Sequence, residues 1–291
     1  MKVRTCLRLV GVVAVLVGMC GVATSRAEET LPASTGQKLR SPEPSQIKAG
    51  LDDARLAGRA ATSVVPDINA LLERGLTTGL AEAALDTLAD IATAAAGDVT
   101  TAKTGLFDTT SATIAPYAQH RNVRVRQAAI KALLHTKGPT AIKAVRHALS
   151  DSDATVRRVA ASGLGSMKAR EAVPDLLIAL EHRVGDAAVS IGQLCDPLEC
   201  DNFVGHLGRQ PFDVMIGGFD QILFRPTAEV SEDAKVTLVG RLAALGTPDA
   251  YRFLRDVRKR WPANGSVRVK QAIEKAMANG SSGAPTGGGA P

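Results

Sequence analysis

The stretch that decides the fold is SDATVRRVAASGLGSMKAREAVPDLLIAL, from Ser152 to Leu180. A related copy lies 31 residues earlier, where Val125-Arg126 aligns with Val156-Arg157 and Ala148-Leu149 aligns with Ala179-Leu180. Within the stretch the apolar residues recur at helical spacing and form one stripe in each half. A fixed period of this length indicates an array of stacked helical hairpins.

The two halves of the unit, VRRVAASGLG and EAVPDLLIAL, resemble the short bacterial, PBS-lyase-like HEAT repeats, whose pattern is VRxxAxxxLG followed by xAVPxLxxAL. The resemblance implies an all-α fold, a right-handed α-solenoid of stacked helical hairpins, and identifies no activity. Some proteins with short HEAT repeats act on tetrapyrrole attachment in phycobiliproteins, and others are DNA glycosylases. The resemblance therefore leaves open an enzyme or enzyme subunit of the HEAT-like lyase type.

The composition suits an elongated repeat array better than a globule. Of the 291 residues, 45% are hydrophobic but only 3% are aromatic, and alanine is abundant. Small side chains let helices pack closely, and a solenoid core is a continuous ribbon between two helix layers. We predict one solenoid domain over residues 46–279.

The first 27 residues have the order of a secretory signal peptide. Lys2, Arg4 and Arg8 precede an apolar run from Leu9 to Met19, and Ser25-Arg26-Ala27 supplies small residues at −3 and −1. The sequence predicts cleavage after Ala27 and a location in the periplasm or outside the cell. Cys20 offers a lipid-anchor alternative, but Met19 replaces the small residue that a lipobox has before its cysteine.

Removing residues 1–27 leaves a nearly neutral chain. The full sequence has 35 basic and 29 acidic residues, and the signal segment holds four of the basic residues and none of the acidic ones. The mature net charge is therefore +2. Nucleic-acid binding is typical of domains with a basic excess, so the sequence argues against it.

Two segments outside the array have the composition of flexible chain. Residues 28–45 are rich in Pro, Ser and Thr and predict a flexible linker, and residues 280–291 carry no charge and predict a disordered tail. Within the array the repeat pattern is lost over residues 195–226, which indicates an irregular insert or a degenerate repeat.

The mature chain keeps two cysteines, Cys195 and Cys200, in the sequence CDPLEC. Because Pro197 favours a turn between them and export leads to an oxidising compartment, the interpretation we prefer is a disulfide. A free thiol pair and a zinc site that also uses Asp201 and His206 are the alternatives.

Phenylalanine is concentrated directly after Cys200. Four of the six Phe residues, namely Phe203, Phe212, Phe219 and Phe224, lie within 22 positions. The preferred interpretation is a core filled by larger side chains, and the alternative is an exposed aromatic anchor for a partner.

Three repeat arginines lie off the apolar stripe: Arg126, Arg157 and Arg158. In the resembled family an arginine at this point commonly bonds an acidic residue near the start of an adjoining helix, here Asp151 or Asp153. The functional hypothesis is that these arginines line the concave face and bind an acidic partner.

No GxSxG, Walker, HExxH, dinucleotide-binding or paired CxxC motif occurs in the sequence. No catalytic, cofactor-binding or metal-binding residue is therefore predicted. The sequence favours an exported, non-enzymatic scaffold that binds a protein or peptide.

Overall fold

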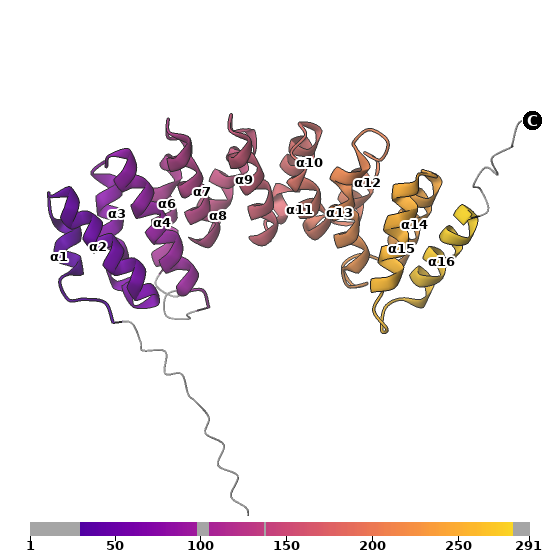
Figure 1. Ribbon diagram of the computed structural model, residues 1–291, viewed down its shortest axis with the longest axis horizontal. Coiled ribbons are helices and arrows are strands. Elements are labelled where there is room, and N and C mark those ends of the chain that lie inside the picture. Colours follow the sequence, from indigo (N-terminus) through magenta and orange to yellow (C-terminus); the bar gives the residue numbers. More distant parts are fainter. Residues whose placement is uncertain (1–29, 98–104, 137, 282–291) are drawn as a thin grey trace, which may run out of the picture.

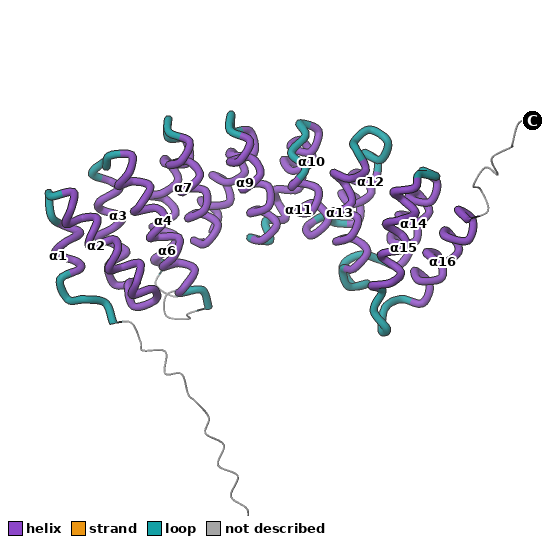
Figure 2. Tube along the Cα trace, in the orientation of Figure 1, coloured by secondary structure: helices purple, strands orange, loops and turns teal. Residues whose placement is uncertain are grey.

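The computed structural model describes residues 30–97, 105–136 and 138–281. Its helices stack in an arc, with the first and last helices at opposite ends (Figure 1). Apart from one isolated bridge between Leu207 and Gln210, these residues form helices and loops without β-strands (Figure 2). The predicted all-α solenoid of stacked hairpins is confirmed.

The helices form two layers. One layer contains α2 (Pro44–Ala57), α4 (Thr78–Ala94), α7 (Val123–Thr136), α9 (Ala154–Ser166), α11 (Asp186–Leu194) and α13 (Phe212–Phe224), each packed on the next. The other contains α1 (Thr35–Arg40), α3 (Val65–Glu73), α6 (Leu106–Ile114), α8 (Gly138–His147), α10 (Val173–Glu181) and α12 (Pro197–Val204). The array ends with α14 (Glu232–Ala244), α15 (Pro248–Arg260) and α16 (Val267–Ser281).

Between the layers runs one continuous apolar core. It extends from Leu39 to Ala276 and consists mainly of Ala, Leu, Val and Ile side chains. In the central repeat, Val156 and Leu164 of α9 and Leu176 of α10 are fully buried. These are members of the two stripes that the sequence predicts, so each stripe is the inner face of one layer.

Helix boundaries follow from local chemistry. Proline occupies the first turn of α2, α3, α10, α12 and α15, where its missing N–H costs no hydrogen bond. Asp153 accepts a hydrogen bond from the Val156 amide at the start of α9, and Thr247 caps α15 through the Ala250 amide at 3.3 Å.

The predicted flexible linker over residues 28–45 is wrong for most of its length. Residues 35–40 form α1, and α2 begins at Pro44. Leu39 is fully buried against Gly50, whose missing side chain leaves room for it. Lys38 pairs with Asp53 at 2.7 Å, which further fixes α1. One buried leucine in a six-residue helix is too weak a pattern to be recognised in sequence.

Residues 195–226 form a degenerate repeat, because α12 and α13 continue the stack as a hairpin. Phe203 and Phe219 are fully buried, with ring centroids 5.2 Å apart, and Phe212 and Phe224 pack partly buried against the core. The interpretation of the phenylalanines as core is supported for this hairpin. The larger rings occupy the space that alanine and leucine fill elsewhere.

The Cys195–Cys200 pair lies at the connection between α11 and α12. The two Sγ atoms are 1.97 Å apart, the distance of a disulfide bond. The buried Arg225 guanidinium donates to the Cys195 carbonyl at 2.8 Å and to the Gly192 carbonyl at 3.3 Å, so it caps the C-terminal end of α11. The pair and Arg225 together fix the point where α11, α12 and the segment after α13 meet.

Opening the Cys195–Cys200 bond is expected to lower the free energy of unfolding by about 2 kcal/mol, because the bond closes a short loop in the unfolded chain. The measurement is urea denaturation of the full chain with and without a dithiol reductant. A variant carrying both Cys195→Ala and Cys200→Ala is the control, and its midpoint should not respond to the reductant. A wild-type midpoint that ignores the reductant would show that the bond does not form in solution.

Candidate partner-binding surface

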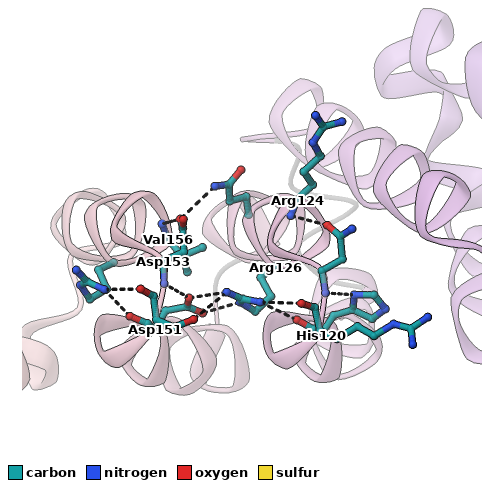
Figure 3. A network of polar contacts seen from close by, with 11 residues as sticks. His120, Arg124, Arg126, Asp151, Asp153 and Val156 are labelled. Carbon is teal, nitrogen blue, oxygen red and sulfur yellow. Dashed lines mark hydrogen bonds and ion pairs between the residues drawn. The ribbon is translucent and has the colours of Figure 1, made fainter.

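Arg126 lies in a network that ties two repeats together at the helix starts (Figure 3). Its Nε and Nη2 atoms each bond one carboxylate oxygen of Asp151 at 2.8 Å, and Nη1 donates to the His120 carbonyl at 3.0 Å. The side chains of Arg126 and Asp151 are only 13% and 9% exposed. Bidentate arginine–carboxylate pairs are strong and geometrically specific, so this pair fixes the stacking of α7 on α9.

Electrostatics follow from this geometry. The hydrogen bonds that Arg126 donates to the Asp151 carboxylate raise the pKa of Arg126. Burial alone would raise the pKa of Asp151, but the hydrogen bonds from Arg126 and the Asp153 amide outweigh it. The pKa of Asp151 therefore lies below its ordinary value of 3.8. Both groups are charged at neutral pH and hold each other in place.

Arg157 repeats the backbone half of this arrangement. Its Nη1 donates to the carbonyls of Asp151 at 2.7 Å and Ser152 at 3.0 Å, the positions equivalent to His120 and Arg121 one repeat earlier. Among the described residues no carboxylate pairs with Arg157 in the way that Asp151 pairs with Arg126. Arg157 therefore also stabilises the repeat array through bonds within the protein.

Arg158 is the accessible member of the predicted set. Its side chain is 66% exposed and pairs with Asp186 at the start of α11, with Nε 3.1 Å from the carboxylate. Gln127 makes the equivalent bond to Asp153 at 3.3 Å. Each of the three arginines thus bonds a group at the start of its own or the next repeat's helix, and we call this set of bonds the arginine ladder. The structure supports a framework role for all three arginines.

Similar cross-links recur along the array. A basic side chain on one helix pairs with an acidic side chain on a neighbouring helix in each of these pairs: Arg40–Asp67, Arg55–Asp90, Lys131–Asp86, Arg146–Asp175, Arg241–Asp201 and Arg268–Asp233. Many of the acidic and basic side chains of the chain therefore pair with each other and join neighbouring repeats. A charged residue at a repeat position therefore does not by itself indicate a binding site in this protein.

An open groove lies between α13 and α15. Its volume is about 740 Å³, and its apolar floor contains Phe212, Ile216, Gly217 and Phe253. The rim is charged and carries these residues: Asp213, Asp220, Asp249, Arg252, Asp256, Lys259 and Arg260. An apolar floor with a polar rim is the anatomy of a protein interface.

The groove is open because α15 packs less closely on α13 than α13 packs on α11. The Phe212 and Phe253 rings meet edge to face at 6.1 Å, and Arg260 pairs with Asp220 and stacks on the Phe224 ring at 5.0 Å. Residues 225–231 connect α13 to α14 without helix. Sequence reasoning identified the phenylalanines but predicted no groove beside them, because the half-buried Ile216 and the buried Phe253 keep ordinary helical core spacing.

A second hollow, of about 1000 Å³, lies beside α6, α8 and α10. Lys143, Arg146, His147 and Asp175 are among its lining residues, and Asp175 is already paired with Arg146. Across the part of the chain that the structure describes, no cluster of His, Cys, Asp and Glu has the arrangement of a metal site. The zinc alternative for the cysteines thus gains no support.

None of the helices within the described ranges is long and apolar enough to cross a membrane. The predicted signal peptide, its cleavage site at Ala27 and the alternative lipid anchor at Cys20 lie outside the described residues. The predicted tail lies outside them from residue 282 onwards, whereas residues 280 and 281 belong to α16.

Comparison with known proteins identifies the repeat. Residues 111–212 match the family model of HEAT repeats. An engineered protein of the Northeast Structural Genomics Consortium has a similar fold, with a TM-score of 0.50 and 16% identity over 86% of this chain and 68% of the other. No curated protein matches the sequence at a significant level.

Two further structures are similar at a lower level. The complex of CpcE and CpcF of phycocyanin lyase from Nostoc sp. PCC7120 aligns with 16% identity over 84% of this chain and 92% of that one, at a TM-score of 0.42. A designed armadillo repeat protein aligns with 13% identity over 84% and 98%, at a TM-score of 0.44. The family match identifies residues 111–212 as HEAT repeats, and they are set within an α-helical solenoid that continues on both sides of them.

Proposed function

We propose that the protein is an exported, non-enzymatic scaffold that binds a protein or peptide partner in the groove between α13 and α15. The observation that carries the proposal is the groove itself, whose floor is apolar and whose rim is charged. Rigid grooves of this kind take up apolar anchors of a partner, and such anchors supply most of the binding energy. The signal-like order of residues 1–27 supports export.

The three repeat arginines have a different role in this proposal from the one that their spacing suggests. Arg126 and Arg157 stabilise the array, and Arg158 remains an exposed residue that a partner can touch. The binding surface lies instead at the C-terminal end, where the repeat is degenerate. Departures from the repeat consensus mark the site better than the consensus itself does.

Replacing Ile216 by aspartate is expected to reduce partner capture at least tenfold, because a charge on the groove floor must lose its water when an apolar anchor enters. The measurement is affinity purification of the mature protein from its native envelope fraction, with the partner quantified by mass spectrometry. The same spectra give the mature start, expected at Glu28, whereas a diacylated Cys20 would overturn the predicted cleavage site.

Ile178→Asp is the control, because Ile178 is 54% exposed on α10 and does not line the groove. It should capture as much partner as the wild type. Asp213→Lys changes the exposed rim without touching the floor and guards against a folding defect in Ile216→Asp. Equal capture by wild type and both groove variants would contradict the proposal.

A further inference from the structure

The charge of the protein is concentrated in its last hairpin. Residues 248–281, which form α15 and α16, contain eight basic and three acidic residues. Residues 28–247 contain 23 basic and 26 acidic residues. The end of the array therefore carries a net charge of +5, whereas the rest of the mature chain carries −3.

Among the described residues, the ion pairs of this hairpin leave Arg255 without a carboxylate partner. Arg252 pairs with Asp249 at 3.0 Å within α15, and Arg258 pairs with Glu274 of α16 at 3.3 Å. Arg255 lies between them, exposed, and makes no ion pair within the described residues. Its positive charge is available to a ligand.

These arginines line another groove, which lies between α15 and α16 and is called the second groove below. Its volume is about 780 Å³, and Arg252, Arg255 and Arg258 lie at successive intervals of three residues along α15. Pro248 and Met277 add apolar surface, and Glu274 lies among the cations. The phenol of Tyr251 also lines the groove and donates to the Ala243 carbonyl.

We infer that this second groove binds an acidic segment of a protein partner, in which carboxylates alternate with apolar side chains. Guanidinium groups bind carboxylates through two parallel hydrogen bonds. The apolar surface of Pro248 and Met277 matches side chains between the carboxylates, and Glu274 disfavours a continuous polyphosphate. The two grooves share Arg252, so one partner can lie across α15 and occupy both. The inference rests on the proposed function and names the chemistry of the partner.

The test uses the full mature chain and a fluorescent twelve-residue peptide of repeated Glu-Leu-Glu-Ala. Fluorescence anisotropy is expected to show salt-dependent binding. The same peptide with glutamine in place of glutamate should bind at least tenfold more weakly. Arg255→Glu should also weaken binding at least tenfold without changing the melting temperature, because Arg255 is exposed and has no ion-pair partner to lose.

Arg124→Glu is the matched control, because Arg124 is exposed on α7, its guanidinium has no ion pair among the described residues, and the charge change is the same. Peptide binding should be unaffected by it. Equal loss in both variants, or no binding of the glutamate peptide, would overturn the inference.

Two further probes distinguish other polyanions. A twelve-nucleotide single-stranded DNA and phosphatidylglycerol vesicles should each bind more weakly than the glutamate peptide. Tighter binding of either through Arg255 would replace the inferred partner. Because partner capture by the first groove is tested with Ile216→Asp, failure of this inference leaves that proposal standing.

Discussion

Replacing Gly192 by alanine is expected to lower the free energy of unfolding by about 3 kcal/mol, although alanine is the better helix former. Gly192 of α11 lies directly against Gly218 of α13. A Cβ atom at Gly192 would come within 2.8 Å of the Gly218 Cα and 2.9 Å of the Gln221 Cβ, and closer still to the Gly218 carbonyl oxygen. Because those neighbours are mainly backbone, the two helices must separate to accept even a methyl group.

The same crossing also contains a large side chain. A Cβ at Gly218 would meet the Phe203 ring at 2.6 Å, so the absence of a side chain at Gly218 leaves room for the buried Phe203 against α13. Separation of α11 from α13 would therefore also loosen α12. The loss is measured by urea denaturation, with hydrogen exchange of α11–α13 locating it.

Gly240→Ala is the control for this substitution. Gly240 is exposed in the middle of α14, and no heavy atom lies within 4 Å of an added Cβ. Its replacement should stabilise the protein by about 0.5–1 kcal/mol through helix propensity. If Gly192→Ala is also stabilising, the close contact of α11 and α13 does not exist in solution.

The second large effect is expected at Arg126, whose change to alanine should lower the free energy of unfolding by about 3 kcal/mol. The substitution leaves the Asp151 carboxylate buried without its partner, and it also removes the donor to the His120 carbonyl. Urea denaturation gives the total loss. Arg158→Ala should cost less than about 1 kcal/mol, because its pair is solvent-exposed.

Acid titration separates the ion pair from simple packing. Because the folded pKa of Asp151 is lowered, its contribution to stability is fully present above its ordinary pKa of 3.8 and is lost as the pH falls through the folded value. Wild-type stability should therefore fall over that range more steeply than that of Asp151→Asn. If Arg126→Ala and Arg158→Ala lowered the free energy of unfolding equally, the buried Arg126–Asp151 pair would not have the role in the arginine ladder that its geometry indicates.

The part of the fold that could be predicted from the sequence differs from one region to another. The central repeats were readable because Val156, Leu164 and Leu176 keep helical spacing and recur, so both layers and their inner faces follow from the sequence. Helix α1 was not readable, since its stability comes from one leucine fitting over Gly50 and a pair between Lys38 and Asp53. Such contacts depend on partners distant in the chain.

The candidate site was predicted only in outline. Periodicity indicated that Arg126, Arg157 and Arg158 point away from the core. It does not show whether each guanidinium is already hydrogen-bonded to a carboxylate or carbonyl of the protein. The basic excess of α15 and α16 is visible in the sequence. Whether this basic excess can bind a partner depends on which cations have no ion pair. Only the three-dimensional arrangement shows that Arg255 has none among the described residues.

The central claim is that the C-terminal end of the solenoid is the surface that holds the partner. It is tested most directly by photo-crosslinking in the native cell, with benzoylphenylalanine placed at position 216, 255 or 56. Leu56 is 69% exposed on α2 at the opposite end of the arc (Figure 1). The account predicts that positions 216 and 255 crosslink to the same protein and that position 56 does not. Crosslinking of that protein from position 56 and not from 216 or 255 would contradict it.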